Sequence, residues 1–212
     1  FPFGTGNDFG SALGLKVAPM EALEDLLRAQ PVSIDAAAAN DTIFINAAGT
    51  GFDVDVIRNT EKYKRRFNGM LPYMLGIFKS LMDLKWDHFT ITADGETFEE
   101  DAILIDACNG TRLAGGIKVA RIAELNDGML DVCRVRKLGR LGVLRVLPSV
   151  VAGRHLNSPH VRYFKAKELR LESTRANTLN LDGELGSSTP VTFKILPGAL
   201  MLLLPPKEED NA

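Results

Sequence analysis

The sequence predicts a mostly β protein with helices (α+β), in which an antiparallel β-sandwich follows the remnant of an α/β nucleotide-binding domain. Apolar segments of strand length fill most of the chain after residue 31, and turn signals separate them about every eight to twelve residues. Near the start, a Gly-rich turn leads into a helical segment, as at the end of a nucleotide-binding α/β unit. The predicted divisions are the remnant at 1–31, the sandwich at 32–198, and a closing strand and tail at 199–212.

Helices and strands alternate in the first half of the chain. Apolar residues recur at helical spacing until Pro31 ends the run, and Asn40 and Asp41 then form a turn between two strands. A later run of apolar residues forms one stripe of a helix. The predicted segments are a helix at 20–30, strands at 32–40 and 41–49, a short helix or mobile loop at 53–66, and a helix at 71–85.

Strands dominate the second half. Asp94 and Gly95 interrupt alternating residues and predict a hairpin, and AILIDACNG reads as a nearly continuous apolar strand. A helix with basic ends follows at 139–155, with a kink expected at Pro148. The charged end KEEDNA predicts a disordered tail. Further strands are predicted before residue 136 and near 161–173, 177–182, 190–196 and 199–204.

Composition excludes several classes of protein. The chain has 212 residues, of which 45% are hydrophobic and 25% charged, as in an ordinary globular domain. A net charge of −2 gives no electrostatic basis for non-specific nucleic-acid binding. Cys108 and Cys133 lie in apolar surroundings and predict buried free thiols. No signal peptide is apparent, and the run ALMLLLPP is too short to span a bilayer, so we expect a cytoplasmic protein.

Two Gly-containing stretches are candidates for binding a ligand through the backbone. In GTGND, residues 4–8, the amides and the following helix N-terminus could hold a phosphate. The alternative is an ordinary turn with a helix cap. In CNGTRLAGG, residues 108–116, the glycines fit either a close backbone approach or a wide loop between strands.

Two acidic turns are candidates for catalysis and metal binding. Glu124 and Asp127 flank a tight turn in ELNDGML, which suits a hard cation such as Mg²⁺ or forms a solvated turn. In LNLDGEL, residues 179–185, Asp182 and Gly183 fit a hairpin turn. A carboxylate there could instead accept a proton from a substrate hydroxyl.

Taken in order, FGTGNDFGSALGL, FINAAGTGFDVDVI, NGTRLAGG, ELNDGMLDV and LDGE resemble the diacylglycerol kinase catalytic-domain family. Within that family the sequence looks like the bacterial soluble lipid kinases, which are related to sphingosine and ceramide kinases and more distantly to NAD kinases. The resemblance covers nearly the whole chain. It implies an N-terminal ATP-binding domain with a Gly-Gly-Asp-Gly-Thr loop, a C-terminal β-sandwich and an active site between them. Because that loop is absent, we expect GTGND to be the second nucleotide-facing loop of a domain whose first part lies outside the chain.

The resemblance also implies residue roles. Glu184 matches the proton acceptor, with Asp182 beside it, and Asp8 lies beside the phosphates and acceptor. Many members have an arginine where this chain has Ser11, so a contact by that arginine is not carried over. The implied nucleotide-binding residues are Gly4, Thr5, Gly6 and Asn7, with Thr5 contacting ATP, and the implied Mg²⁺ ligands are Glu124, Asp127 and the Met129 carbonyl.

The function so implied is ATP-dependent phosphorylation of the hydroxyl of diacylglycerol or a similar lipid, with the isolated chain inactive. A lipid-binding or regulatory module of the same fold, and a kinase for a sphingoid base or another alcohol, remain alternatives. Expected partners are ATP with Mg²⁺ and a membrane lipid contacted peripherally; apolar edges are compatible with a homodimer. Candidate lipid-facing residues are Phe52, Tyr73, Leu75 and Phe78 in a crevice, and Lys62, Lys64, Arg65 and Arg66 at lipid headgroups.

Overall fold

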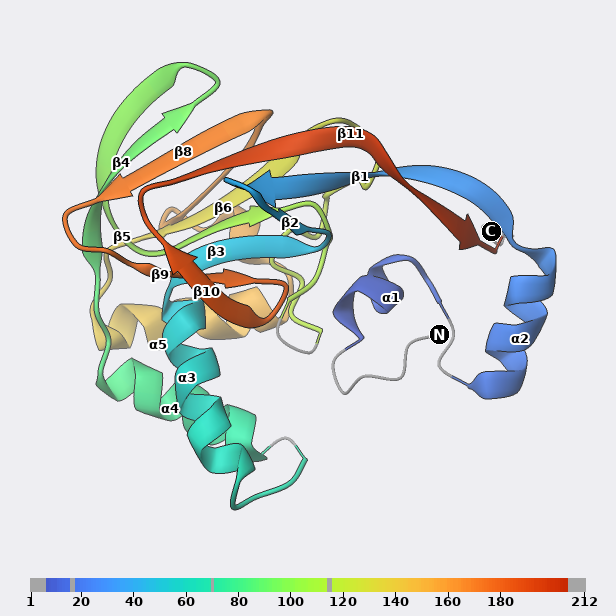
Figure 1. The fold of residues 1–212 in the computed structure, drawn as a ribbon. Helices are drawn as coiled ribbons and strands as arrows, with labels where there is room; N and C mark the ends of the chain where they lie inside the picture. The colour runs from blue at the N-terminus through green and yellow to red at the C-terminus, as the bar shows by residue number, and fades with distance from the viewer. Residues whose placement is uncertain (1–6, 16–17, 70, 114–115, 206–212) are drawn as a thin grey trace.

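One curled antiparallel sheet of eleven strands dominates this computed structural model (Figure 1). The structure describes residues 7–15, 18–69, 71–113 and 116–205. The main path of the sheet runs β10-β9-β3-β5-β4-β8-β11-β1-β2, and β6 pairs with β5 and carries β7. The strands are β1 (Gln30–Ala39), β2 (Thr42–Phe44), β3 (Ala47–Gly51), β4 (Asp87–Ala93), β5 (Glu96–Cys108), β6 (Leu130–Arg136), β7 (Val161–Ala166), β8 (Glu168–Ser173), β9 (Thr178–Leu181), β10 (Glu184–Ser188) and β11 (Val191–Leu204).

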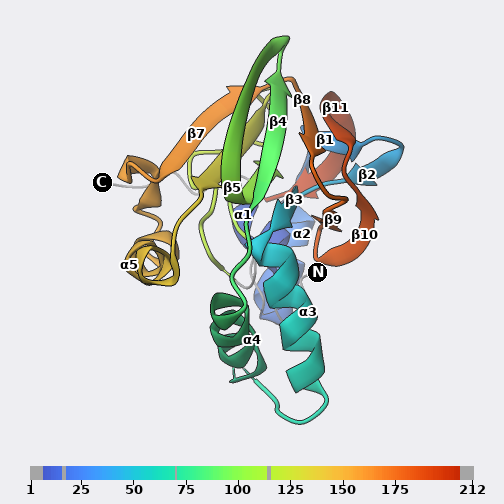
Figure 2. The ribbon, with the colours of Figure 1, turned by 90° about the vertical axis from the view of Figure 1, so that its left-hand side faces the viewer.

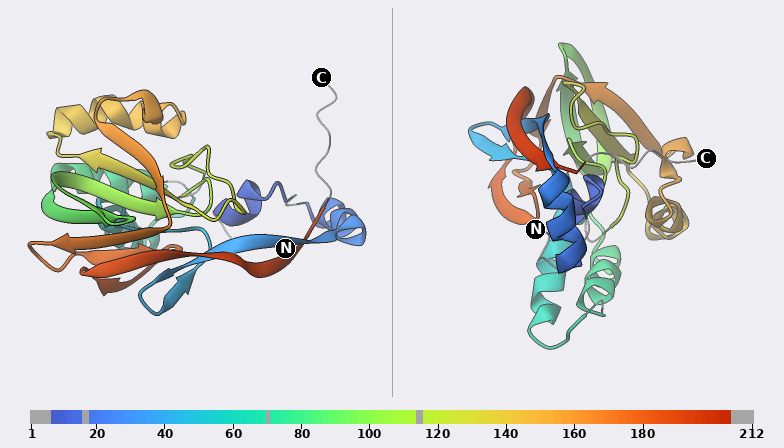
Figure 3. Two further views of the ribbon diagram at one scale, coloured as in Figure 1. Left: turned by 90° about the horizontal axis from the view of Figure 1, so that it is seen from above. Right: turned by 90° about the vertical axis from the view of Figure 1, so that its right-hand side faces the viewer.

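Helices lie on and beyond the sheet. Figure 2 shows α3 and α4 side by side below the sheet, with α5 apart from them on the side of β7. From above, α2 lies at one end of the molecule and the β4–β5 hairpin at the other (Figure 3). The helices are α1 (Asp8–Ala12), α2 (Pro19–Arg28), α3 (Phe52–Lys64), α4 (Leu71–Met82) and α5 (Arg140–Val151), with a 3₁₀ turn, η1, at His155–Asn157.

Two apolar cores hold these layers together. The larger lies inside the curl of the sheet and includes Phe44, Phe89 and Phe193, of which Phe44 and Phe193 pack edge to face with centroids 6.1 Å apart. The smaller joins the outer side of β5 and β6 to α4 and α5 through residues such as Leu81 and Val143. Burial of apolar surface on both sides of β5 explains why its sequence is a nearly continuous apolar run.

The predicted fold class is confirmed, with the strands joined in one curled sheet. Cys108 and Cys133 are buried free thiols, as predicted. The predicted hairpin is present, with positive φ angles of 47° at Asp94 and 92° at Gly95. Among the described residues, no helix is both long and apolar enough to cross a membrane.

Several boundaries differ from the prediction. Residues 53–64 lie in the thirteen-residue helix α3, and β10 was not foreseen. The two strands predicted at 190–196 and 199–204 are one strand, β11, because β1 pairs with both parts across an irregularity at Asp35. This strand runs through the division predicted at residue 198. The domain divisions stay predictions, and the predicted tail from residue 206 lies outside the described residues.

Candidate functional site

The Asp-Gly-Glu turn joins β9 to β10. Asp182 has a φ of 51° and Gly183 one of 96°, so the turn uses left-handed backbone at both positions. The Asp182 carboxylate accepts hydrogen bonds from the backbone amides of residues 45, 46 and 47, at 2.7, 2.9 and 2.9 Å. Asp182 therefore fastens the turn to the start of β3, and both its oxygens are used in doing so.

Glu184 begins β10, directly opposite Leu181 in the hairpin register, and its side chain is exposed. The side chain of Asn180 also stabilises the turn that precedes Glu184. Asn180 accepts the Gly183 N–H at 2.9 Å and donates its amide to Asp53 Oδ2 at 2.9 Å. The hydrogen bonds from Asp182 and Asn180 leave the carboxylate of Glu184 accessible on a rigid turn.

Asp8 lies in the first turn of α1, which Asn7 precedes with a φ of 49°. Burial raises the pKa of Tyr73 on α4 well above its ordinary value, and the charges of Asp8 and Asp53 raise it further. Asp8 on α1 and Asp53 on α3 therefore both lie near enough to Tyr73 on α4 to act on it electrostatically. Gly4, Thr5 and Gly6 lie outside the described residues.

Two acidic side chains that the sequence analysis did not select lie beside this region, Asp106 buried and Asp53 half-buried. Burial raises the pKa of Asp53 to about 6, although the hydrogen bond from Asn180 opposes that effect. Burial raises the pKa of Asp106 well above its ordinary range, and the charge of Asp53 adds to it. Within the described residues, Oδ1 of each carboxyl has no hydrogen-bond partner. The available signal was Asp106 itself, a carboxylate inside the apolar strand ILIDAC.

The turn predicted to bind Mg²⁺ lies between residue 124 and β6. Asp127 accepts the Met129 N–H at 3.0 Å and forms an ion pair with Lys165 on β7. Glu124 is exposed. Burial is the main cause of the raised pKa of Asp131, and the nearby charge of Glu124 raises it further. In the described part of the chain, no three His, Cys, Asp or Glu side chains form a group that could hold a metal ion. The predicted Mg²⁺ ligands, Glu124, Asp127 and the Met129 carbonyl, stay a prediction, and Asp127 is engaged by Lys165 in this structure.

Two further residues join the predicted motifs to one another. Asp35, in the irregularity of β1, accepts the N–H groups of Gly128 and Gly198, both at 2.8 Å. Asn109 donates its side-chain amide to the carbonyls of Asp35 and Ile45, at 2.9 and 2.7 Å. Gly110 follows with so little space that a Cβ there would meet the Asn46 side chain. The predicted close backbone approach at this loop is therefore present, with the protein itself as the partner.

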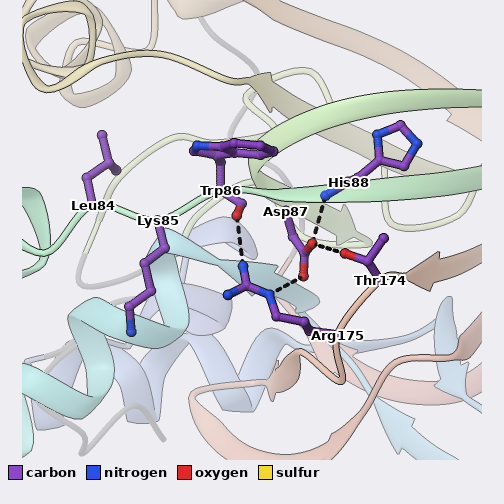
Figure 4. Close-up of a pocket in the computed structure, with 7 residues that line it drawn as sticks. All are labelled: Leu84, Lys85, Trp86, Asp87, His88, Thr174 and Arg175. Carbon is purple, nitrogen blue, oxygen red and sulfur yellow. Dashed lines mark hydrogen bonds and ion pairs between the residues drawn. The ribbon is translucent and has the colours of Figure 1, made fainter.

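An open cavity of about 570 Å³ lies where α4 leads into β4 (Figure 4). Asp87 accepts hydrogen bonds there from the His88 amide and the Thr174 hydroxyl, and Arg175 bridges Asp87 to the Trp86 carbonyl. These internal bonds already satisfy the polar groups at its centre. Neither this cavity nor the adjoining groove of about 190 Å³ is lined by the residues predicted to face a lipid, which were Phe52, Tyr73, Leu75 and Phe78.

Comparison with known proteins agrees with this fold. Residues 46–204 match the family described as the YegS C-terminal NAD kinase beta sandwich-like domain. The chain is 30% identical over 205 residues to a probable lipid kinase YegS-like protein of Shewanella frigidimarina, covering 97% of this chain and 66% of the relative. It is 29% identical over 211 residues to a diacylglycerol kinase of Bacillus subtilis, covering 99% and 70%.

Solved structures give the same result. A proposed diacylglycerol kinase from Bacillus anthracis superposes with a TM-score of 0.79 at 26% identity, covering 96% of this chain and 66% of that one. A second structure from that organism superposes with a TM-score of 0.69 at 22% identity, covering 96% and 65%, and shows the fold alone. The chain thus spans about two thirds of the length of the proteins that it matches.

Proposed function

The chain belongs to the family of the YegS C-terminal NAD kinase beta sandwich-like domain, and from this premise we propose that it carries the acceptor side of an ATP-dependent lipid kinase. The reaction transfers the γ-phosphate of ATP to the hydroxyl of diacylglycerol or a similar lipid. The relatives' names support the class of enzyme. The observation that carries the proposal is the rigid Asp-Gly-Glu turn with an accessible glutamate.

Glu184 is the proposed proton acceptor. A lipid hydroxyl has a pKa far above 7, so a carboxylate within hydrogen-bond reach helps as the O–H proton leaves. Phosphoryl transfer depends mainly on the position of the reactants and the neutralisation of charge, which favours a carboxylate on an immobile turn. Asp182 is a positioning residue in this scheme, because three backbone amides use its oxygens.

ATP is proposed to approach residues 4–8, with Thr5 contacting the nucleotide and Gly4, Gly6 and Asn7 forming the loop beside it. Asp8 then lies between the phosphates and the acceptor. The effect of its charge on Tyr73 supports this role, because it places Asp8 near α4. Mg²⁺ enters the reaction with the nucleotide and neutralises phosphate charge.

Contact with a lipid surface is proposed for α4 and the end of α3. Leu71, Met74, Phe78 and Met82 are spaced so that they lie on one face of α4, and all four are exposed. Lys62, Lys64, Arg65 and Arg66 are also exposed, in the segment that leads into this helix. An apolar helical face next to cations fits a surface of anionic lipids, which attracts nearby cations by about 1 kcal/mol per charge.

The test follows labelled phosphate from ATP into diacylglycerol, sphingosine and glycerol in mixed micelles, with the longest form of the protein that its gene encodes. Label in diacylglycerol that Glu184→Gln abolishes supports the enzyme and its proton acceptor. Label in sphingosine or glycerol alone would change the acceptor. Lipid binding without transfer to any acceptor would contradict the kinase and favour a binding or regulatory module.

A further inference from the structure

Asn180, which precedes the Asp-Gly-Glu turn, lies in one row of the sheet with Asp106. Gly49 on β3 stands opposite Asp106 on β5 and opposite Asn180 on β9 in the strand register. Directly opposed residues place their side chains on the same face of a sheet, and both of these side chains are buried. A Cβ at Gly49 would lie 1.9 Å from Asp106 Oδ1, so glycine leaves the room that this carboxyl needs. A carboxyl and a carboxamide therefore share one buried face beside the turn.

Asp53 reaches the same region from the first turn of α3. β3 ends at Gly51, and α3 begins at the next residue. Gly51 has a φ of 111°, and a Cβ there would lie 2.2 Å from the Ile103 carbonyl oxygen. The backbone therefore passes from strand to helix without a loop. This close connection fixes Asp53 relative to β3 and to Asn180 on the neighbouring strand.

The carboxamide of Asn180 is used at both ends. Its oxygen accepts the Gly183 N–H, and its amino group donates to Asp53 Oδ2, each at 2.9 Å. A backbone N–H only donates, so Asn180 presents its oxygen to Gly183 and its amino group to Asp53. The Asp53 carboxyl accepts that amino group in either protonation state, because a proton can sit on Oδ1. Asp53 therefore favours the one orientation of the carboxamide in which the Gly183 N–H has an acceptor.

We propose that Asp53 is a positioning residue for the proton acceptor, because through Asn180 it fixes the turn that precedes Glu184. The inference rests on the proposed function, in which Glu184 accepts the proton of the substrate hydroxyl. Asp182 already ties the turn to the start of β3. Asn180 holds Gly183, the residue directly before Glu184. A shift of about 1 Å in a catalytic group can cost about 10²-fold in rate, so loss of this bond should lower turnover.

The test exchanges the two hydrogen-bonding groups in the longest form of the protein that its gene encodes. It is made at pH 8, where Asp53, whose pKa burial raises to about 6, is ionised. In Asn180→Asp, the new carboxylate faces that of Asp53, and the two repel each other. In the double variant, Asp53→Asn with Asn180→Asp, an amide again donates to a carboxylate and the total charge is that of the parent.

Asn177→Asp is the matched control. Asn177 directly precedes β9 and also donates its side-chain amide to a carboxylate, that of Asp87, at 2.7 Å. The same substitution there creates the same repulsion outside the turn. A general loss of stability would therefore appear in Asn177→Asp as well, whereas loss of position at Glu184 would not.

In Asn180→Asp, the Gly183 N–H should exchange with deuterium about tenfold faster or more than in the parent, because its acceptor turns away. The kcat for lipid phosphorylation should fall by about tenfold or more, while the KM for ATP changes little. The double variant should recover most of both losses. Asn177→Asp should match the parent in the exchange of Gly183 and in kcat.

Two results would overturn the inference: equal exchange of Gly183 in Asn180→Asp and Asn177→Asp, or a double variant no better than Asn180→Asp. If Asn180→Asp does not fold, Asp53→Leu, which removes the acceptor, is compared with Asp53→Asn, which keeps one. Equal exchange of Gly183 in those two variants would overturn it as well.

The inference and the proposed function fail separately. A kinase that Asn180→Asp leaves fully active would refute the positioning role alone. Loss and recovery of protection at Gly183, in a protein that phosphorylates no acceptor, would refute the kinase and leave Asp53 as the anchor of the turn.

Discussion

Asp182 and Glu184 are two residues apart and have different environments. The sequence analysis placed both among the catalytic residues. In the structure, three backbone amides bind the Asp182 carboxylate, whereas Glu184 is exposed at the start of β10. Their substitution should therefore have different consequences for stability and for activity.

Glu184→Gln should lower kinase turnover by about 10²–10⁴-fold while leaving the melting temperature unchanged, because it removes a base and no internal hydrogen bond.

Asp182→Ala should lower the free energy of unfolding by about 1–3 kcal/mol or more, because the backbone amides of residues 45–47 lose their acceptor. Turnover and thermal melts of both variants check this. A stable, fully active Glu184→Gln would remove this residue from the mechanism.

Asp106 should make stability depend on pH. The raised pKa values of Asp106 and Asp53 mean that the folded protein retains protons which the unfolded chain releases above about pH 4. The free energy of unfolding therefore falls as pH rises, from about 4 to about 6 for Asp53 and to higher pH for Asp106. Asp106→Asn should raise the melting temperature at pH 8 and have little effect near pH 4.

Asp101→Asn, on the same strand, is the control for this pH effect. Hydrogen bonds from His88 and Lys137 lower the pKa of Asp101, so its contribution is present at neutral pH and is lost on acidification. Its substitution should therefore destabilise the protein at pH 8, the opposite sign to Asp106→Asn. Parallel melting curves for the parent and Asp106→Asn from pH 4 to 8 would refute the assignment.

At the scale of elements, α4 shows how a helix can be packed and exposed at once. Gly76 and Ser80 face inward, where a Cβ at Gly76 would meet Thr60 of α3, and Ser80 accepts a hydrogen bond from Asn59. The opposite face presents Met74 and Phe78, which are 64% and 63% exposed. An apolar stripe therefore predicts a helix correctly without showing which part of the stripe the protein itself covers.

The exposed face of α4 should contribute to lipid binding. Met74→Ser with Phe78→Ser should weaken sedimentation with vesicles of anionic lipid several-fold, because it removes apolar area that would otherwise leave water. Leu141→Ser with Leu144→Ser on α5 exchanges similarly exposed residues and controls for loss of surface hydrophobicity. Equal loss in both pairs, or no loss in the first, would contradict a specific lipid-facing role for α4.

At the scale of the whole molecule, hydrogen bonds between side chains and backbone groups connect motifs that are far apart in the chain. The Gly128 turn is fastened to Asp35, Asn109 links Asp35 to Ile45, and Asp182 holds the amide of Ile45. These hydrogen bonds connect the acidic turn to the Asp-Gly-Glu turn by way of Asp35, Asn109 and Ile45. The predicted motifs therefore form one structural unit, although several of them act as scaffold.

Asp35→Ala should loosen this unit. The variant should lose about 1–3 kcal/mol of unfolding free energy in total, because it removes the carboxylate that accepts the part-buried N–H groups of Gly128 and Gly198. Amide hydrogen exchange should quicken in residues 125–130 and around residue 198, and little in the β4–β5 hairpin. Asp41→Ala, in an exposed turn of the same region, is the control, and equal exchange in both variants would argue against the linkage.

The sequence by itself determined the class of fold, the hairpin at Asp94, the helical runs in α2 and α4 and the buried thiols. These features depend on local spacing and turn chemistry, which the chain states directly. The order of its motifs also identified the family. The sequence missed β10, because Glu184–Ser188 has no apolar alternation, and it left α3 undecided because its residues are mostly polar.

Only the tertiary structure decided which acidic residues bind backbone, which are buried and which are open to a substrate. Asp35, Asp182 and Glu184 look alike as carboxylates in the sequence. Their roles differ because segments distant in sequence bring backbone amides to the carboxylates of Asp35 and Asp182, whereas Glu184 is exposed. The ion pair between Lys165 and Asp127 likewise depends on the fold, because the two residues lie far apart in the sequence. A carboxylate's environment depends on which donors the fold brings within reach, and that is a property of strand pairing across the whole chain.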